Sequence, residues 1–556
     1  MSQINESLES KAKEKSFDKM TKAQQAIIWR ISASLCSLIG ALAEAQDDIL
    51  MAISQNDGIT GFLLGLLSRE FVDPAALDEL LSCMITLTED NTPFCEELQN
   101  ATTALDLLLK QKDLDGTTSV LVCGVLHNVF AVLGWNDNKP GVRGVTDRDL
   151  IPRLAITLQD YKGEGAEKKQ NGGDWIAPSE IVTIAIEVLA AIATSIQDTF
   201  GTTEEAREPR DVDVAVEEDE EMKDADMEDA DEQNGSGNKD SERGDDDDGD
   251  KSMDDEAIAE DMEAVLGNDE ADARIDDLPT LEIFLKKALP QVLRLAGLEP
   301  KSEDEMAIKI HAVSVLNNLA WSLSCVDFSK GQNVGLRNAW RPHAGRIWEK
   351  VVTAILDSDT EDLELATEIT SLSWALARAL GEDVPLKEGQ HKKFISLYHA
   401  AKKLEAAALN NGNADGEEKK QIADDDDPFQ TLGVKCIGVL GQLALHGTAP
   451  VALNRDVGVF LVAVVSALPE TRAAEAVEAL NQLFDVYGDE DAACDKEVFW
   501  KDNFLKHLEA SAAKVKVMLR GIHKHEEKTR ELRARAEEVV MNLDRFIAYK
   551  KKHRPS

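Results

Sequence analysis

A short phrase recurs along this chain and constrains its fold more than any other feature. Along the chain, each copy has a small residue and then a Leu, followed by any residue, an Asn or Gln, and a Leu or Val. The copies are GVLHNV (124–129), SVLNNL (314–319), GVLGQL (438–443), EALNQL (478–483) and the looser VVMNL (539–543). The third and fourth copies start 40 residues apart. Repeats of about 34 to 47 residues are typical of TPR, HEAT and armadillo solenoids.

Apolar residues at helical spacing fill most of the chain on either side of an acidic stretch. Aromatic residues make up only 5% of the chain, so Leu, Ala, Val and Ile supply the apolar surface, which favours packed helices over sheets. A helix pair cannot bury its apolar face alone, so neighbouring repeats stack into one continuous core. The predicted fold is all-α: a right-handed α-solenoid of ARM/HEAT-type helical repeats, interrupted by a long acidic disordered loop.

Composition shifts predict the domain organisation. The expected parts are a disordered N-terminus (1–20), N-terminal ARM/HEAT repeats (21–202), an acidic loop (203–278) with a short helix near 252–267, HEAT repeats (279–409), an acidic linker (410–427), C-terminal HEAT repeats (428–549) and a basic tail (550–556). The tail is either a solvated terminus or a basic import signal.

The recurring phrase also predicts a binding surface. A solenoid has a concave face lined by one helix from each repeat, and the amides of the phrase would form a ladder along it. These amides are Asn128, Asn318, Gln442, Gln482 and Asn542. A side-chain amide offers a donor and an acceptor, which suits it to hold the backbone of an extended peptide. Trp321 and Trp374 lie in or beside the phrase and are candidate stacking anchors. Alternatively, the amides cross-link helices and both tryptophans pack in the core.

The acidic stretch, residues 204–277, holds 34 Asp and Glu against 7 Lys and Arg, so it carries 27 of the chain's 45 net negative charges. Such a run cannot bury enough apolar surface to offset its ordering entropy, so most of it is expected to be disordered. It is either a solvated spacer or a docking segment for a basic partner. Within it, SMDDEAIAEDMEAVLGND (252–269) has the apolar spacing of a helix, with a start resembling a capping box.

This amphipathic segment is the sharper candidate for client binding. Asp255, Glu260, Asp261 and Glu263 would supply charge, and Met262, Val265 and Leu266 an apolar anchor. An acidic helix of this kind would suit a basic partner.

Charge, cysteines and motifs exclude several function classes. The net charge of −45 argues against nucleic acid or an anionic membrane as a direct ligand. Seven scattered cysteines without a CxxC pair are expected to be small core residues in a reducing compartment. The N-terminal residues lack a signal-peptide core, and the apolar run 181–196 is expected to be too short to span a bilayer. These features predict a soluble intracellular protein.

The sequence carries no recognisable catalytic signature. No P-loop, HExxH or GxSxG motif occurs, and His127 in its apolar helix is expected to be a hydrogen-bonded core or groove residue. We therefore expect a monomeric, non-enzymatic binding protein with no cofactor and no metal.

Several longer stretches resemble one known family, the symportins. They are KAQQAIIWRISASLCSLIGALA (22–43), CGVLHNVF (123–130), LNNLAWSLSC (316–325), KFISLYHAAK (393–402), DPFQTLGVKCIGVLG (427–441), LNRDVGVFLV (453–462), EALNQLFDVYGDEDAACDKEVFWKDNFLKHLE (478–509) and RFIAYKKKHRP (545–555). Symportins are fungal armadillo/HEAT-repeat chaperones for the ribosomal proteins that bind 5S rRNA. Their members carry a basic import signal and further repeats before the helix matching Ala23, so this chain resembles an N-terminally short form.

The resemblance implies a function for both parts of the chain. The groove would take an extended basic segment of one ribosomal protein, and the acidic loop would cover the RNA-binding surface of another. An import receptor would carry the complex from the cytoplasm into the nucleus for assembly of the 60S subunit. A general importin-type transport receptor and an acidic histone chaperone are the alternatives.

Overall fold

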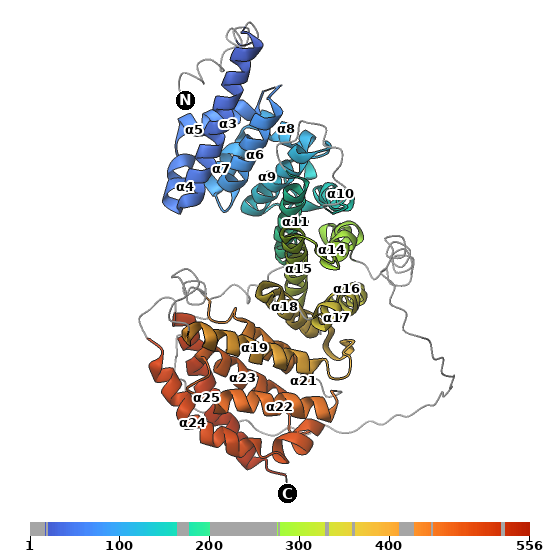
Figure 1. Cartoon of the computed structure of the whole chain (residues 1–556), viewed down its shortest axis with the longest axis vertical. Helices are drawn as coiled ribbons and strands as arrows, with labels where there is room; N and C mark the ends of the chain where they lie inside the picture. The colour runs from blue at the N-terminus through green and yellow to red at the C-terminus, as the bar shows by residue number, and fades with distance from the viewer. Residues whose placement is uncertain are drawn as a thin grey trace, which may run out of the picture. The chain divides into compact units, whose positions relative to one another are not determined.

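The computed structural model shows a chain of stacked helices (Figure 1). It describes Phe17 and residues 20–69, 71–163, 177–200, 275, 278–328, 333–358, 362–410, 427–445, 449–523 and 529–555. Within these ranges there is no β-strand, only an isolated bridge between Asn136 and Lys139. Residues 201–274 lie outside the described ranges, and so does the acidic helix expected near 252–267.

The first group of helices precedes the acidic stretch. It comprises α3 (Lys22–Ala45), α4 (Asp47–Ser54), α5 (Asp57–Leu67), α6 (Pro74–Thr88), α7 (Thr92–Asn100), α8 (Thr102–Gln111), α9 (Thr117–Leu133), α10 (Ile151–Asp160), α11 (Pro178–Ser195) and the 3-10 turn η3 (Ile196–Phe200).

The second group follows the acidic stretch. It comprises α13 (Pro279–Ile283), α14 (Leu289–Ala296), α15 (Glu303–Ser324), α16 (Val334–Ile347), α17 (Thr353–Asp357), α18 (Leu363–Leu380), α19 (His391–Asn410), α21 (Leu432–Leu445), α22 (Val451–Ser466), α23 (Ala473–Tyr487), the π-helical turn η9 (Asp495–Trp500), α24 (Phe504–Gly521) and α25 (Arg530–Lys552).

Local sequence explains where many of these helices begin. Thr21 and Gln24 form a reciprocal capping box at the start of α3. The side chains of Asn56, Ser302 and Asp362 accept backbone N–H groups at the starts of α5, α15 and α18. Pro74 occupies the first turn of α6, where its missing N–H has no intrahelical partner to lose.

One row of helices runs through the chain, each packed on the next. Its members in order are α3, α6, α9, α11, α15, α18, α21, α23 and α25. The other helices pack against this row, for example α14 on α15, α19 and α22 on α21, and α24 on α25. The buried side chains form a continuous cluster along the row, dominated by Leu, Val, Ile and Ala. The all-α solenoid predicted from the sequence is confirmed.

The cysteines follow the expected pattern with one exception. Five of them are buried, Cys494 is partly buried, and all seven are free thiols. Burial raises the pKa of the Cys36, Cys83 and Cys95 thiols to about 12, which keeps them protonated and unreactive. Cys325, at the end of α15, is exposed, so the expectation of a core residue is wrong there.

Two described helices are long and apolar enough to cross a membrane, judged by length and composition. They are α3 and the combined α11–η3, Pro178–Phe200, and the bent pair α4–α5 would make a third span. The expectation that the run 181–196 is too short is therefore wrong, because its helix continues to 23 residues. In the structure α11 packs between α9 and α15. One face of α3 packs on α6, whereas Ile27, Leu38 and other apolar residues lie exposed on it.

Two adjacent residues hold both ends of the acidic stretch. The Asn138 side chain donates to the Thr199 carbonyl at 2.9 Å, just before the stretch leaves the helical row. The Asp137 carboxylate accepts the backbone N–H of Thr280 at 2.9 Å and its hydroxyl at 2.6 Å, where the chain returns as α13. The turn Asp137–Asn138 therefore fixes the exit and the return of this segment next to each other.

Candidate peptide-binding site

The structure places the recurring phrase on consecutive members of the helical row. Its copies lie on α9, α15, α21, α23 and α25, and the related stretch around Trp374 lies on α18. Helix α11, between α9 and α15, carries no copy. The amides differ in their environments, so they do not all have the same role.

The first two amides bind the preceding helix. The Asn128 amide donates to the Ile85 carbonyl at 3.0 Å and to the Thr88 hydroxyl at 3.3 Å, both on α6. The Asn318 amide donates to the Ala190 carbonyl on α11 at 3.3 Å. The Ile85 and Ala190 carbonyls also accept the Thr88 and Thr194 hydroxyls of their own helices, so each amide adds a donor from the next helix of the row. The contacts match the helix-cross-linking alternative, with the N–H groups already engaged inside the fold.

The two tryptophans pair with each other. Trp321 and Trp374 meet edge to face with ring centroids 5.4 Å apart, and both are half-buried. The Trp321 N–H donates to the Ser371 hydroxyl at 3.0 Å, and the Arg378 guanidinium lies 5.4 Å from its ring centroid. The Trp374 ring packs over Gly438 of α21, where a Cβ atom would approach it to 2.3 Å. Helix α21 therefore needs glycine at that position.

The neighbour of Asn318 takes part in a buried polar contact. Asn317 is buried, and its amide donates to the Glu368 carboxylate on α18 at 3.2 Å. Burial raises the pKa of Glu368, and the Lys435 ammonium opposes the increase. The phrase alone does not distinguish the two consecutive asparagines, so sequence reasoning missed Asn317.

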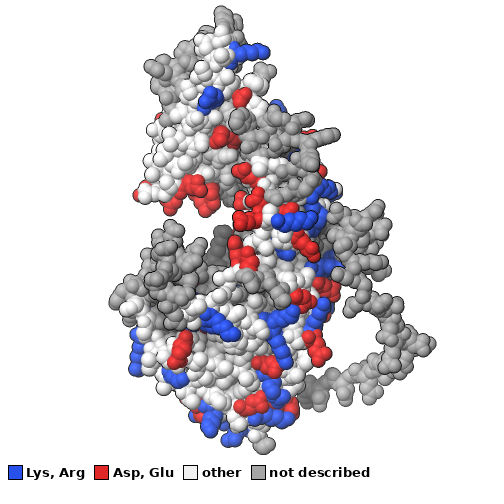
Figure 2. All heavy atoms as spheres, in the orientation of Figure 1, with Lys and Arg blue, Asp and Glu red and all other residues white. Residues whose placement is uncertain are grey.

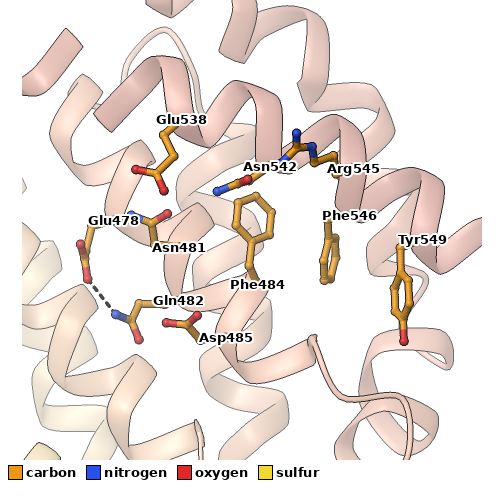
Figure 3. A pocket seen from close by; sticks show the side chains of 10 residues that line it. All are labelled: Glu478, Asn481, Gln482, Phe484, Asp485, Glu538, Asn542, Arg545, Phe546 and Tyr549. Atoms are coloured by element: carbon orange, nitrogen blue, oxygen red, sulfur yellow. Dashed lines mark hydrogen bonds between the residues drawn. The ribbon is translucent and has the colours of Figure 1, made fainter. Parts of the chain in front are cut away.

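A cavity of about 590 Å³ opens between α23 and α25 and contains two predicted amides (Figure 3). Gln482 and Asn542 both line it, whereas Gln442 lies half-buried on α21. The full lining is Glu478, Asn481, Gln482, Phe484, Asp485, Glu538, Asn542, Arg545, Phe546 and Tyr549. These residues recur every three or four positions on each helix, so one face of α23 opposes one face of α25.

Three carboxylates and one guanidinium give this cavity a net negative lining. Glu478 is buried and accepts the Gln482 amide N–H at 2.7 Å (Figure 3). Desolvation by burial raises the pKa of Glu478, and the Arg535 and Arg378 charges oppose the increase. Partial desolvation also raises the pKa of Asp485 at the exposed edge of the cavity. Sequence reasoning missed both carboxylates, although EALNQLFD places them on the helix face that carries Gln482.

The amide of Gln482 rests on a glycine of the neighbouring helix. Its Oε1 atom has no hydrogen-bond partner among the described residues and lies against Gly441 of α21, where a Cβ atom would approach it to 1.9 Å. The contact explains the glycine in GVLGQL and fixes the amide so that its N–H points at Glu478.

His127 forms a structural pair as expected. It is buried on α9, and its Nδ1 atom lies 2.9 Å from the Asp147 carboxylate, which also accepts the Ser195 hydroxyl at 3.4 Å. The trio ties α9, the loop 142–149 and α11 together. Among the described residues, no three His, Cys, Asp or Glu side chains are grouped to hold a metal ion.

Lysines of the basic tail form ion pairs with other helices of the fold. Helix α25 continues to Lys552, and the fully buried Lys550 ammonium lies 2.7 Å from the Asp495 carboxylate. Lys551 pairs with Glu509 at 2.7 Å. On the face drawn in Figure 2, charges of both signs are interspersed over the C-terminal helices, whereas the N-terminal helices show fewer.

Comparison with known proteins identifies relatives of this chain. A family model described as "SYO1-like, TPR repeats" matches residues 424–554, which include the α23–α25 cavity. Symportin 1 of Chaetomium thermophilum is 43% identical over 554 residues, covering 97% of this chain and 79% of that protein. The Schizosaccharomyces pombe armadillo repeat protein involved in nucleocytoplasmic transport, Syo2, is 25% identical over 52% of this chain and 42% of its own length.

One solved structure, a crystal structure of an engineered protein, covers 95% of this chain and 97% of its own at 13% identity and a TM-score of 0.39. The match to Symportin 1 extends over nearly the whole chain, through both groups of helices and the acidic stretch between them. The chain therefore belongs to the symportin family.

Proposed function

We propose that this protein is a non-enzymatic chaperone and adaptor that binds two basic large-subunit ribosomal proteins, one in the groove and one at the acidic loop. It escorts them from the cytoplasm into the nucleus with an import receptor, for assembly of the 5S RNP and the 60S subunit. The observation that carries the proposal is the 43% identity to Symportin 1 over 97% of the chain. The name of Syo2, a protein involved in nucleocytoplasmic transport, supports the transport part.

Charge supports a basic client. The chain carries 45 net negative charges, 27 of them between residues 204 and 277. Complementary charge accelerates encounter with a basic protein and disfavours nucleic acid. The net negative lining of the α23–α25 cavity adds a place for cationic side chains within the solenoid.

The test is affinity purification of the full chain followed by mass spectrometry. Enrichment of the two ribosomal proteins that bind 5S rRNA supports the proposal. A broad set of unrelated cargoes would instead indicate a general importin-type receptor, and core histones would indicate a histone chaperone.

Two variants separate the two proposed client sites. Deleting 252–268, which carries the proposed binding residues Asp255 to Leu266, should abolish binding of one ribosomal protein and leave the other bound. Replacing Asn318 and Trp321 with Ala should weaken the groove client alone. Circular dichroism is the control, because a lost helical signal in the second variant would assign Asn318 and Trp321 to the core. Retention of both clients by both variants contradicts the two-site assignment.

A further inference from the structure

The α23–α25 cavity is lined by three carboxylates, three side-chain amides and one guanidinium, so its net charge is negative. Glu478 accepts one N–H from Gln482, and the nearby Arg535 and Arg378 charges partly offset the rise of its pKa on burial. Glu538 adds a third carboxylate at the edge, and Arg545 is the one cationic side chain in the lining. Glu478 is buried, whereas Asp485 and Glu538 lie exposed at the edge, where a charged donor of a ligand can reach them.

Aromatic rings complete the wall of the cavity. Phe484 of α23 and Phe546 of α25 lie with ring centroids 5.2 Å apart, and Tyr549 follows one turn along α25 (Figure 3). The fold itself places a cation near these rings. The Lys550 ammonium lies 5.6 Å from the Phe546 centroid and 5.8 Å from that of Tyr549, and Asp495 neutralises its charge. Both rings line the cavity and also have neighbours in the fold, with Phe499 at 5.8 Å from Phe546 and His553 at 4.3 Å from Tyr549.

Size and chemistry together select the ligand. A cavity of about 590 Å³ falls within the range of specific small-ligand pockets and exceeds the needs of a single water-filled gap. Its acceptors are spread over two helices rather than gathered at one point. A planar guanidinium presents five N–H donors in a fixed fork and stacks on aromatic rings, whereas an ammonium is a compact, strongly hydrated point charge.

We propose that this cavity binds the guanidinium group of an arginine side chain in an extended basic peptide, with Glu478, Asp485 and Glu538 accepting its N–H groups and Phe546 and Tyr549 lining its flat face. The source of the peptide, a basic client, rests on the proposed function. The preference for arginine over lysine rests on the cavity alone.

The experiment measures binding of a fluorescently labelled peptide, acetyl-Ala-Arg-Ala-Arg-Ala amide, to the full chain by fluorescence anisotropy. Matched peptides carry lysine or citrulline, the neutral analogue of arginine. A salt concentration of about 0.3 M screens exposed charges, including those of the acidic stretch. That stretch attracts arginine and lysine peptides alike, so the arginine preference isolates the cavity.

Two double variants with the same change of charge supply the comparison. Asp485→Asn with Glu538→Gln alters the cavity. Glu537→Gln with Asp544→Asn alters exposed residues of α25 that are absent from the lining and pair with Arg533 and Lys516. The arginine peptide should bind the cavity variant about tenfold or more weakly than the wild type, as expected for a lost charge-assisted hydrogen bond. The control variant should bind it like the wild type.

Three outcomes would overturn the inference: equal binding of the arginine and lysine peptides, retained binding of the citrulline peptide, or equal losses in the cavity and control variants. The client experiment gives a separate answer. An arginine preference without ribosomal clients leaves the cavity assignment standing and removes the proposed function. Ribosomal clients with an unaffected cavity variant remove only the cavity assignment.

Discussion

The buried ion pair of Lys550 and Asp495 makes a quantitative prediction for the substitution Lys550→Met. The two side chains are 1% and 3% exposed and lie 2.7 Å apart. The second Asp495 oxygen accepts the Trp500 indole N–H at 2.9 Å. At that separation and an effective dielectric constant of about 20, the attraction is roughly 6 kcal/mol, much of it offset by the removal of both charges from water.

Removing the lysine leaves the Asp495 carboxylate buried with the indole N–H alone. Loss of one partner of a buried pair costs about 3–5 kcal/mol. Replacing both residues, Lys550→Met with Asp495→Asn, removes the isolated charge, keeps an acceptor for the Trp500 indole N–H and should restore stability to within about 1 kcal/mol of the wild type. The effect should centre on the C-terminal end of the row, where α25 packs on α23 and α24.

Hydrogen exchange followed by mass spectrometry is the suitable assay, since repeat arrays need not unfold in one step and local opening must be measured helix by helix. Amides of α25 should exchange more than about a hundredfold faster in Lys550→Met, corresponding to at least about 3 kcal/mol. Amides of α6 should be unaffected. Exchange in α25 within tenfold of the wild type, or a double variant as unstable as the single one, would refute the reasoning.

Three further predictions follow from contacts described above. Binding of the arginine peptide should strengthen as the pH rises through the elevated pKa values of Glu478 and Asp485, because a cation favours the charged forms of these carboxylates. Titration of affinity against pH checks this, and a flat profile contradicts it. Gly438→Ala should lower the free energy of unfolding by about 1–3 kcal/mol because its methyl group would meet the Trp374 ring. Gly345→Ala should not destabilise α16, because no atom lies within 4 Å of the added methyl group. Equal denaturant midpoints for the two variants would count against this packing. A maleimide reagent should label native protein at Cys325 first, because the buried thiols are protonated and inaccessible. Peptide mapping identifies the labelled site, and labelling of Cys36 before Cys325 would contradict this prediction.

The fold was predictable from the sequence because its signals are local and repeated. The phrase around Leu316 and Leu440 keeps apolar residues at helical spacing, and capping residues such as Thr21 mark where helices begin. Stacking follows from the need to bury those faces. The packing of α11 on α15 across the acidic stretch came from the structure, since no sequence pattern names the partner of either helix.

The binding chemistry was less predictable, since it depends on which neighbour each side chain meets. The same phrase places Asn128 against the end of α6 and Gln482 in an acidic cavity, and no sequence feature separates these outcomes. Lys550 appeared to belong to a solvated tail because its partner Asp495 lies 55 residues away. Sequence pattern gives the face of a helix, whereas packing decides what that face contacts.

Because contacts hold the two ends of the acidic stretch together, the chain can be cut within this stretch without separating its two parts. Asp137 holds Thr280, and the Ser322 hydroxyl donates to the Ala193 carbonyl at 2.8 Å, so segments on either side of the stretch are bound to each other directly. The extensive packing of α11 on α15 adds an apolar seam. A single peptide-bond cut between residues 201 and 277 would therefore leave a nicked protein whose two fragments stay associated. The same seam should allow the two halves to be expressed as separate polypeptides that reassemble by complementation.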